Sequence, residues 1–118
     1  MTTPVKPQIN MEELDKLDIR VGTIVDVSDV SGSDKLLKLT VDLGETTTRT
    51  VLVGMKKERK DPRGEILGKQ ALFVVNLPER TMASVTSQGM LFDIGYADHI
   101  TPVLAVPEKP VPNGTRVG

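Results

Sequence analysis

Cysteine and tryptophan are both absent from this chain of 118 residues, and histidine occurs only once. The lack of cysteine excludes a disulfide framework and a thiolate zinc site. With a single histidine, His99, the chain also cannot form a metal site whose ligands are several histidines. No stretch approaches the roughly 20 consecutive apolar residues of a membrane-spanning helix, and the first residues lack the apolar core of a secretory signal. The sequence therefore predicts a soluble, cytoplasmic protein with no membrane association.

Aromatic residues are also scarce, since Phe73, Phe92 and Tyr96 are the whole set. Proteins that bind single-stranded nucleic acid without sequence preference usually stack bases on aromatic side chains. The two phenylalanines are predicted to lie in the core, which leaves almost nothing for such stacking. If the chain binds nucleic acid, recognition of a folded RNA by shape and phosphate contacts fits the composition better.

The net charge of −1 argues mildly against bulk binding of nucleic acid, but the charge is unevenly distributed. Residues 56–80 carry seven basic and four acidic groups, whereas residues 1–55 carry six basic and nine acidic groups. A solvated loop is the simpler interpretation of this basic stretch, and an electrostatic footprint for a polyanion is the alternative. Four of its basic residues are close together in the sequence: Lys56, Lys57, Arg59 and Lys60.

The sequence predicts that the chain consists of a short N-terminal lead followed by one folded domain. Residues 1–10, which are polar and contain two prolines, are predicted to be a flexible lead or linker, and residues 11–118 a single domain. Asn10 and Glu13 have the spacing of a capping box, which predicts a short helix over residues 11–16. Its apolar side chains share one face and comprise Met11, Leu14 and, just beyond the helix, Leu17.

The rest of the domain has the period-two alternation of β-strands. In the first strand, Val21, Thr23, Val25 and Val27 are expected on one face, and Gly22 is expected to mark a bend or bulge. A type I turn is expected at residues 61–64, with any helix there being short, and an extended segment at residues 100–106. The five expected strands cover residues 20–27, 37–43, 49–53, 69–77 and 88–94.

This pattern predicts an all-β fold, a five-stranded Greek-key barrel of OB type with a short N-terminal helix and an extended C-terminal segment. An SH3-like barrel or a short sandwich is the alternative. In an OB barrel, the loops after the first and fourth strands flank the ligand face. Five residues of these two loops are the candidate binding site, with an ordinary surface loop as the alternative: Lys35, Asn76, Arg80, Ser87 and Met90.

Signals of catalysis are weak by comparison. Asp15 with Asp18, and Asp26 with Asp29, are close in sequence, but general acid–base chemistry would need them to face each other in a cleft. A charged helix end or strand edge is the simpler interpretation. No glycine-rich phosphate loop has the required spacing. The sequence therefore predicts a binding domain and not an enzyme.

Several short motifs occur in an order that resembles the tRNA-binding domain family. Members of this family occur at the C-terminus of many methionyl-tRNA synthetases, in eukaryotic synthetase cofactors and as free-standing small proteins. The resemblance covers about Met11 to Val117, nearly the whole chain. The motifs are Leu-Asp-Ile-Arg-Val-Gly-Thr-Ile at 17–24, Asp-Lys-Leu at 34–36, Val-Asp-Leu-Gly at 41–44, Asn-Leu at 76–77 and Ser-Gln-Gly-Met at 87–90.

The resemblance implies an OB fold and structure-selective binding of tRNA, without catalysis and without a cofactor. Lys35 and Arg80 would contact phosphate, Asn76 and Ser87 would bond sugar or base edges, and Met90 would orient its loop. It also implies a homodimer formed through Met11–Leu17 and Ile100–Val117, which would double a modest basic footprint.

At one loop, this chain departs from the family pattern. Thr81, Ala83 and Ser84 stand where the pattern is rich in lysine and arginine and has a glycine, so fewer phosphate contacts and a flatter salt dependence are expected. A neighbouring branch of the family contains dimeric export chaperones that bind unfolded polypeptide, and the tail of this chain, residues 111–118, resembles theirs. Polypeptide binding is therefore the alternative function. The sequence leaves open whether the chain is a free-standing protein or the end of a synthetase.

Overall fold

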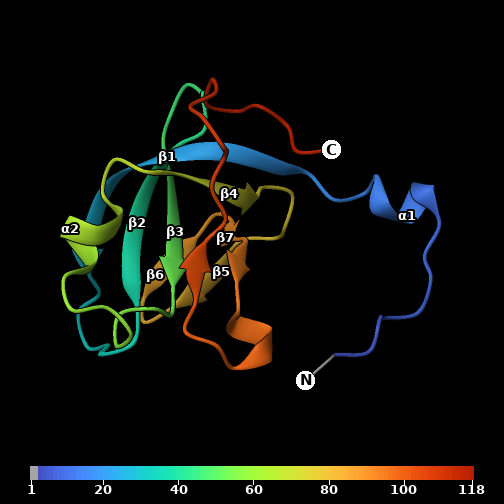
Figure 1. Cartoon of the computed structure of the whole chain (residues 1–118). Helices are drawn as coiled ribbons and strands as arrows, with labels where there is room; N and C mark the ends of the chain where they lie inside the picture. Colours follow the sequence, from blue (N-terminus) through green and yellow to red (C-terminus); the bar gives the residue numbers. More distant parts are fainter. Residues whose placement is uncertain (1–2) are drawn as a thin grey trace.

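The computed structural model describes residues 3–118, and its main feature is a five-stranded antiparallel sheet that curls into a nearly closed barrel of OB type (Figure 1). The strand order is β3-β2-β1-β4-β7, and two further pairs, β5–β6 and β8–β9, extend from it. The fold class predicted from the sequence is confirmed. In chain order the elements are α1 (Met11–Leu14), β1 (Ile19–Asp29), β2 (Leu37–Asp42), β3 (Arg49–Val53), α2 (Pro62–Ile66), β4 (Gln70–Val74), β5 (Arg80–Met82), β6 (Val85–Ser87), β7 (Met90–Leu91), β8 (Asp93–Ile94), the short 3-10 helix η1 (Tyr96–Asp98) and β9 (Val103–Leu104).

Alternation along β2 builds one wall of the core as the sequence predicts. Leu37, Leu39 and Val41 are buried, whereas Lys38 and Thr40 between them are only partly covered. The period of two in the side-chain direction places the three apolar residues on the inner face of the barrel. They pack there against Phe73 of β4, which is fully buried as expected. The predicted bounds of β3 are also confirmed.

The alternation of β1 is interrupted, and this corrects the prediction for its inner face. The register with β2 shifts between Ile24 and Asp26, so Val25 is an extra, unpaired residue of a β-bulge. Val25 is therefore 44% exposed, and Val27 joins the fully buried Ile24 in the core. The prediction that Val25 lies on the same face as Val21 and Val27 is wrong, because the bulge reverses the face along the strand.

Gly22 serves a different purpose from the expected bulge. A Cβ atom at this position would lie 2.7 Å from Cγ1 of Val41 and 2.8 Å from Cδ2 of Leu43. Only a residue without a side chain lets β1 and β2 approach this closely. The glycine therefore marks close packing of two strands, and the bulge lies three residues further along.

Between β3 and β7, the two edges of the sheet, a few side-chain and backbone hydrogen bonds complete the barrel where the structure records no strand ladder. The Ser87 hydroxyl accepts a hydrogen bond from the Leu52 amide at 3.0 Å. The Gln88 amide donates to the Thr50 carbonyl at 2.7 Å, and the Thr50 amide donates to Oε1 of Gln88 at 2.9 Å. We call this contact between β3 and residues 87–88 the seam.

A hairpin that the sequence did not predict occupies part of the connection between β4 and β7. Strands β5 and β6 pair in register, and a turn at Ala83 and Ser84 joins them. Both residues have positive φ, 50° and 66°, as a type I′ turn requires. The usual Asn-Gly signal of that turn is missing here, so the segment resembled a polar loop.

The fifth predicted strand, residues 88–94, is broken into β7 and β8 at Phe92. Phe92 is 43% exposed, so its prediction as a core residue is wrong. The expected turn at residues 61–64 also takes another form. Asp61 caps α2, with its carboxylate accepting a hydrogen bond from the Gly64 amide at 3.1 Å, and the buried Ile66 of this short helix closes one end of the barrel.

The two ends of the chain differ in how they pack. Residues 3–10 form no helix or strand, and the capping box predicted at Asn10 and Glu13 starts α1 with both of its hydrogen bonds present. Figure 1 shows α1 standing away from the barrel. Residues 1–2, the beginning of the predicted lead, lie outside the described residues. The C-terminal segment runs back over β1, where Val21 exchanges backbone hydrogen bonds with Gly114 and Thr115.

Candidate nucleic-acid interface

Two adjacent hollows form a continuous groove beside the end of β3. The first has a volume of about 490 Å³ and the second about 630 Å³, and Leu52, Gly54 and Tyr96 line both of them. The first hollow is mostly apolar and reaches Phe92. The second reaches Met82 at the tip of the β5–β6 hairpin. We refer to the two hollows together as the groove.

Three of the five predicted site residues lie at this groove. Lys35 enters from the loop between β1 and β2 and lines the second hollow, while Arg80 of β5 and Met90 of β7 line the first. All three are exposed. The structure therefore brings together residues 45 or more positions apart, from the two loops that were expected to share a rim. Their part in ligand binding stays a prediction.

Ser87 is placed differently from the other site residues. It is only 5% exposed, and its hydroxyl donates a hydrogen bond to the Gly89 carbonyl at 3.0 Å while accepting one from Leu52. The hydroxyl group of Ser87 therefore already has both a hydrogen-bond donor and a hydrogen-bond acceptor within the protein. Its clearest role in the structure is to hold the seam, and the contact with sugar or base edges is a prediction that the geometry does not favour.

Asn76 lies in a third, polar hollow of about 290 Å³, beside Arg20 and Arg49 and separate from the groove. Its side-chain amide donates to the Lys16 carbonyl at 2.6 Å, and its oxygen accepts from the Asp18 amide at 3.0 Å. These bonds tie the segment after α1 to the end of β4. Asn76 therefore has a structural role that the sequence did not reveal.

The basic stretch expected to widen the electrostatic footprint is largely neutralised by carboxylates. Each of three cations forms an ion pair, and Arg59, whose side chain is only 13% exposed, is mostly covered. Among residues 3–118, Lys35, Lys60 and Arg80 take part in none of the recorded ion pairs. Lys35 and Arg80 are therefore the cations of the groove lining that no ion pair recorded among the described residues neutralises, and Glu58 and Asp93 are the carboxylates that line it with them. The pairs are Lys56–Asp29 at 3.1 Å, Lys57–Asp34 at 3.5 Å and Arg59–Glu65 at 3.1 Å.

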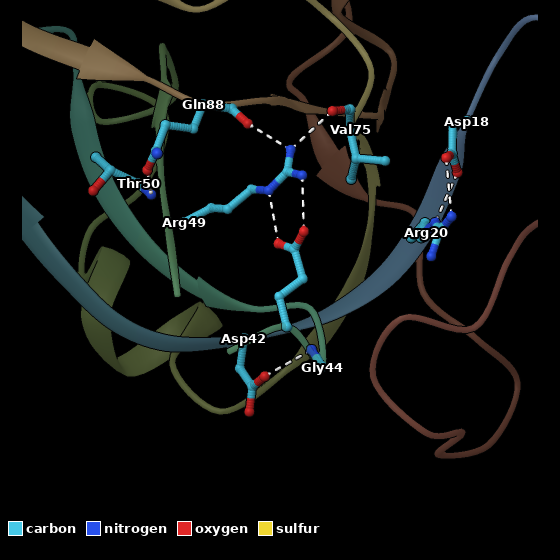
Figure 2. A network of polar contacts seen from close by, with 9 residues as sticks. Asp18, Arg20, Asp42, Gly44, Arg49, Thr50, Val75 and Gln88 are labelled. Atoms are coloured by element: carbon cyan, nitrogen blue, oxygen red, sulfur yellow. Dashed lines mark hydrogen bonds and ion pairs between the residues drawn. The ribbon is translucent and has the colours of Figure 1, made fainter. Parts of the chain in front are cut away.

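An arginine that sequence reasoning missed contacts both ends of the segment between β4 and β7. Arg49, the first residue of β3, forms a two-pronged ion pair with Glu45 and donates to the carbonyl oxygens of Val75 and Gln88 (Figure 2). Hydrogen bonds from Arg49 hold the pKa of the Glu45 carboxyl below its ordinary value. The two carbonyl groups are 26 and 39 residues away from Arg49 in the sequence, so no local sequence pattern predicts this contact.

Three of the four carboxylates considered as acid–base pairs, Asp18, Asp26 and Asp29, face cations. Asp18 binds Arg20 through both oxygens, at 2.8 and 3.0 Å, and these hydrogen bonds lower the pKa of Asp18. Asp26 pairs with Arg63, and Asp29 is the partner of Lys56 described above. The interpretation as charged strand edges therefore fits the structure.

Within residues 3–118, no helix is both long and apolar enough to cross a membrane. Over the same range, no cluster of three or more His, Cys, Asp or Glu side chains could hold a metal ion.

Comparison with known proteins identifies the family. Over 113 residues the chain is 41% identical to a methionine–tRNA ligase of Methanococcoides burtonii, of which it spans only 16%. Its fold matches a MetRS related protein from Pyrococcus horikoshii with a TM-score of 0.85 and 32% identity, over 96% of this chain and 100% of the other. It also matches a CsaA chaperone protein from Picrophilus torridus, with a TM-score of 0.79 and 26% identity over 94% and 100%. Residues 19–116 match the family model described as "Putative tRNA binding domain", and the chain therefore belongs to the tRNA-binding domain family.

Proposed function

We propose that this domain is a non-catalytic, structure-selective tRNA-binding module and that the groove is its binding site. The observation that carries the proposal is that Lys35 and Arg80 line one groove and take part in none of the ion pairs recorded among residues 3–118, although the carboxylates of Glu58 and Asp93 also line it. Phosphate contacts from such cations supply much of the affinity for a nucleic acid and fix its register. Membership of the tRNA-binding domain family supports tRNA as the chemical class of the ligand.

The groove suits a folded RNA better than a flexible single strand. Tyr96 and Phe92 are the exposed aromatic side chains beside it, and they are too few for a run of stacked bases. Charged side chains from two loops can instead follow the shape of a helical backbone. Met90, which is exposed and lines the first hollow together with Arg80, would provide an apolar contact on this surface.

We further propose that the domain acts as a homodimer. The exposed apolar side chains of residues 11–17 and 100–106 support this, because large apolar residues on an otherwise polar surface are typical of interaction sites. A two-fold interface would place two grooves on one particle and double its cationic footprint. The exposed residues are Met11, Leu14, Leu17, Ile100, Val103 and Val106.

The direct test is a titration of bulk tRNA against the purified domain at several salt concentrations, with duplex DNA as the control. The proposal expects tRNA binding that exceeds DNA binding and weakens as salt rises. Equal affinity for DNA, or no binding at low salt, would refute it. Sedimentation of the free protein over a range of concentrations tests the homodimer, and a monomer at every concentration would refute that part.

A second candidate function is binding of unfolded polypeptide. The first hollow of the groove is lined mainly by apolar side chains, including Leu52, Met90 and Phe92. The hairpin beside it carries Thr81 and Ala83, which add no positive charge. Suppression of the aggregation of a denatured client, without binding of tRNA, would favour this function.

A further inference from the structure

We propose that Arg49 is a positioning residue: it supports the residues that line the groove and does not itself contact the ligand. Its guanidinium fixes both ends of the segment that carries Arg80, and so determines where Arg80 and Met90 lie. This inference rests on the proposed function, because it concerns the same binding surface. It assigns a role in binding to a side chain outside that surface.

The placement of the two carbonyl groups is the central observation. Nη1 of Arg49 donates to the Val75 oxygen at 2.8 Å and to the Gln88 oxygen at 3.0 Å (Figure 2). Val75 directly precedes the segment 76–87, and Gln88 directly follows it. One nitrogen atom therefore clamps the start and the end of the 12-residue segment that contains the β5–β6 hairpin. Removing the clamp takes a hydrogen bond from both ends at once, while Asn76 and the seam keep their own bonds.

The other side of the same guanidinium is fixed by Glu45. Nε and Nη2 bind the two carboxylate oxygens at 2.8 and 3.0 Å. Such a two-pronged pair restricts the plane of the guanidinium, which in turn aims Nη1 at the two carbonyl groups. A lysine at this position has a single ammonium group and cannot make both sets of bonds with fixed geometry.

Arg49 acts through the loop and not by direct contact, as its location shows. Its side chain is 25% exposed and lines the third hollow beside Asn76, whereas Arg80 and Met90 line the groove. The seam continues the linkage, because Gln88 also pairs with Thr50, the neighbour of Arg49 on β3. Rigid support of this kind keeps a binding group in its productive geometry.

The test compares Arg49→Met with a matched control, Arg63→Met. Arg63 also binds one carboxylate and one backbone carbonyl, those of Asp26 and Val27, but it lies in α2 and away from the groove. Both variants lose one positive charge. We expect tRNA affinity to fall about tenfold in Arg49→Met and less than about twofold in Arg63→Met, because only the first change disturbs the binding loop.

A double-mutant cycle separates positioning from an independent contribution. If Arg49 acts through Arg80, the loss of affinity in the double variant Arg49→Met/Arg80→Ala is clearly smaller than the combined losses of the two single variants. Additive losses would overturn the inference. If Arg49→Met does not fold, the same cycle with Arg49→Lys decides, with a smaller expected loss because the ammonium group keeps the positive charge and one donor nitrogen.

Hydrogen exchange supplies a readout that needs no RNA. We expect the amides of residues 76–87 to exchange faster in Arg49→Met than in the wild type, with those of β2 unchanged. Unchanged exchange in residues 76–87 would overturn the inference even if the wild type binds tRNA. Conversely, faster exchange in a domain that binds no tRNA would refute the proposed function and the binding role, while the clamp itself would be established.

Discussion

Gln88 and Thr50 exchange two hydrogen bonds across the seam, one between backbone groups at 2.7 Å and one from the Thr50 amide to the Gln88 side chain at 2.9 Å. Two residues of an antiparallel ladder normally exchange this pair of bonds through their backbones alone. Here one side chain replaces a backbone carbonyl. The barrel is thus completed at a point where its strands do not form a continuous ladder.

The first prediction concerns this replacement. Gln88→Ala leaves the Thr50 amide without its acceptor, so we expect the free energy of unfolding to fall by about 1–2 kcal/mol. Urea unfolding followed by far-UV circular dichroism measures the change. Gln8→Ala, in the exposed N-terminal segment, is the control and is expected to have no effect. Equal midpoints for the two variants would show that the side-chain bond does not stabilise the barrel.

Close packing at Gly22 gives a second prediction. In Gly22→Ala the new methyl group would overlap Val41 and Leu43, so we expect a loss of about 1–3 kcal/mol in the free energy of unfolding. Gly54→Ala is the matched control, because no atom lies within 4 Å of its added Cβ and its φ is ordinary. The control is expected to be neutral or slightly stabilising. Comparable losses in both variants would contradict the packing argument.

The turn of the β5–β6 hairpin gives a third prediction, in the opposite direction. Ser84 has a φ of 66°, a region that costs a residue with a side chain roughly 1 kcal/mol compared with glycine. Ser84→Gly is therefore expected to raise the midpoint of urea unfolding. Ser31→Gly, at a turn position that is not among the positive-φ residues of the described chain, is expected to lower it slightly. A lower midpoint for Ser84→Gly would show that its backbone carries no relievable strain.

The phosphate contact proposed for Arg80 gives the fourth prediction. Arg80→Ala should weaken tRNA binding several-fold at low salt, and the slope of log Kd against log salt should become about one unit shallower. Filter binding or fluorescence anisotropy at four or more salt concentrations measures both quantities. Arg63→Ala removes the same charge from α2 and should leave the slope unchanged. If the two variants behave alike, Arg80 is not part of the site.

The fifth prediction is a pH dependence of stability. Ion pairs with Arg49 and Arg20 lower the pKa values of Glu45 and Asp18 in the folded state from their ordinary values of 4.5 and 3.8. A lowered pKa in the folded state means that this stabilisation is fully present above the ordinary pKa and is lost as the pH falls through the folded value. Both pairs are partly exposed, so the loss is expected to be modest.

Glu45→Gln tests this pH dependence. Its midpoint of urea unfolding should fall less than that of the wild type as the pH is lowered from about 6 to about 3. The control is Glu12→Gln in α1, whose carboxylate takes part in none of the ion pairs recorded among residues 3–118. Parallel curves for the wild type and Glu45→Gln would show that the pair with Arg49 does not contribute to the acid sensitivity.

Local patterns in the sequence were sufficient for the features that depend on neighbouring residues. The capping box at Asn10 and the alternation along β2 are read within a few positions, and both are confirmed. The bounds of β3 were correct for the same reason. Turn chemistry was less informative, since Ala83 and Ser84 adopt positive φ without the residues that normally signal it.

Features that depend on distant partners were not predictable. The bulge at Val25 is set by the register with β2, and the burial of Ser87 is set by the Leu52 amide 35 residues earlier in the chain. Asn76 was expected at the binding rim, but its amide is engaged by the segment after α1. The sequence motifs thus located the groove loops, whereas the structure separates the residues that support them from those that are exposed.

The seam also limits how the binding specificity of this domain can change during evolution. Ser87 and Gln88 lie within the motif that marks the family, yet both are bonded to β3. A substitution there changes folding stability before it changes ligand preference. With the groove as the proposed binding site, a change of ligand is expected to cost less stability at Arg80, Met82 and Met90, whose side chains line the groove and carry no part of the seam. Differences in ligand among such domains are therefore expected to arise from substitutions in the β5–β6 hairpin and at its edges, while the seam residues remain unchanged.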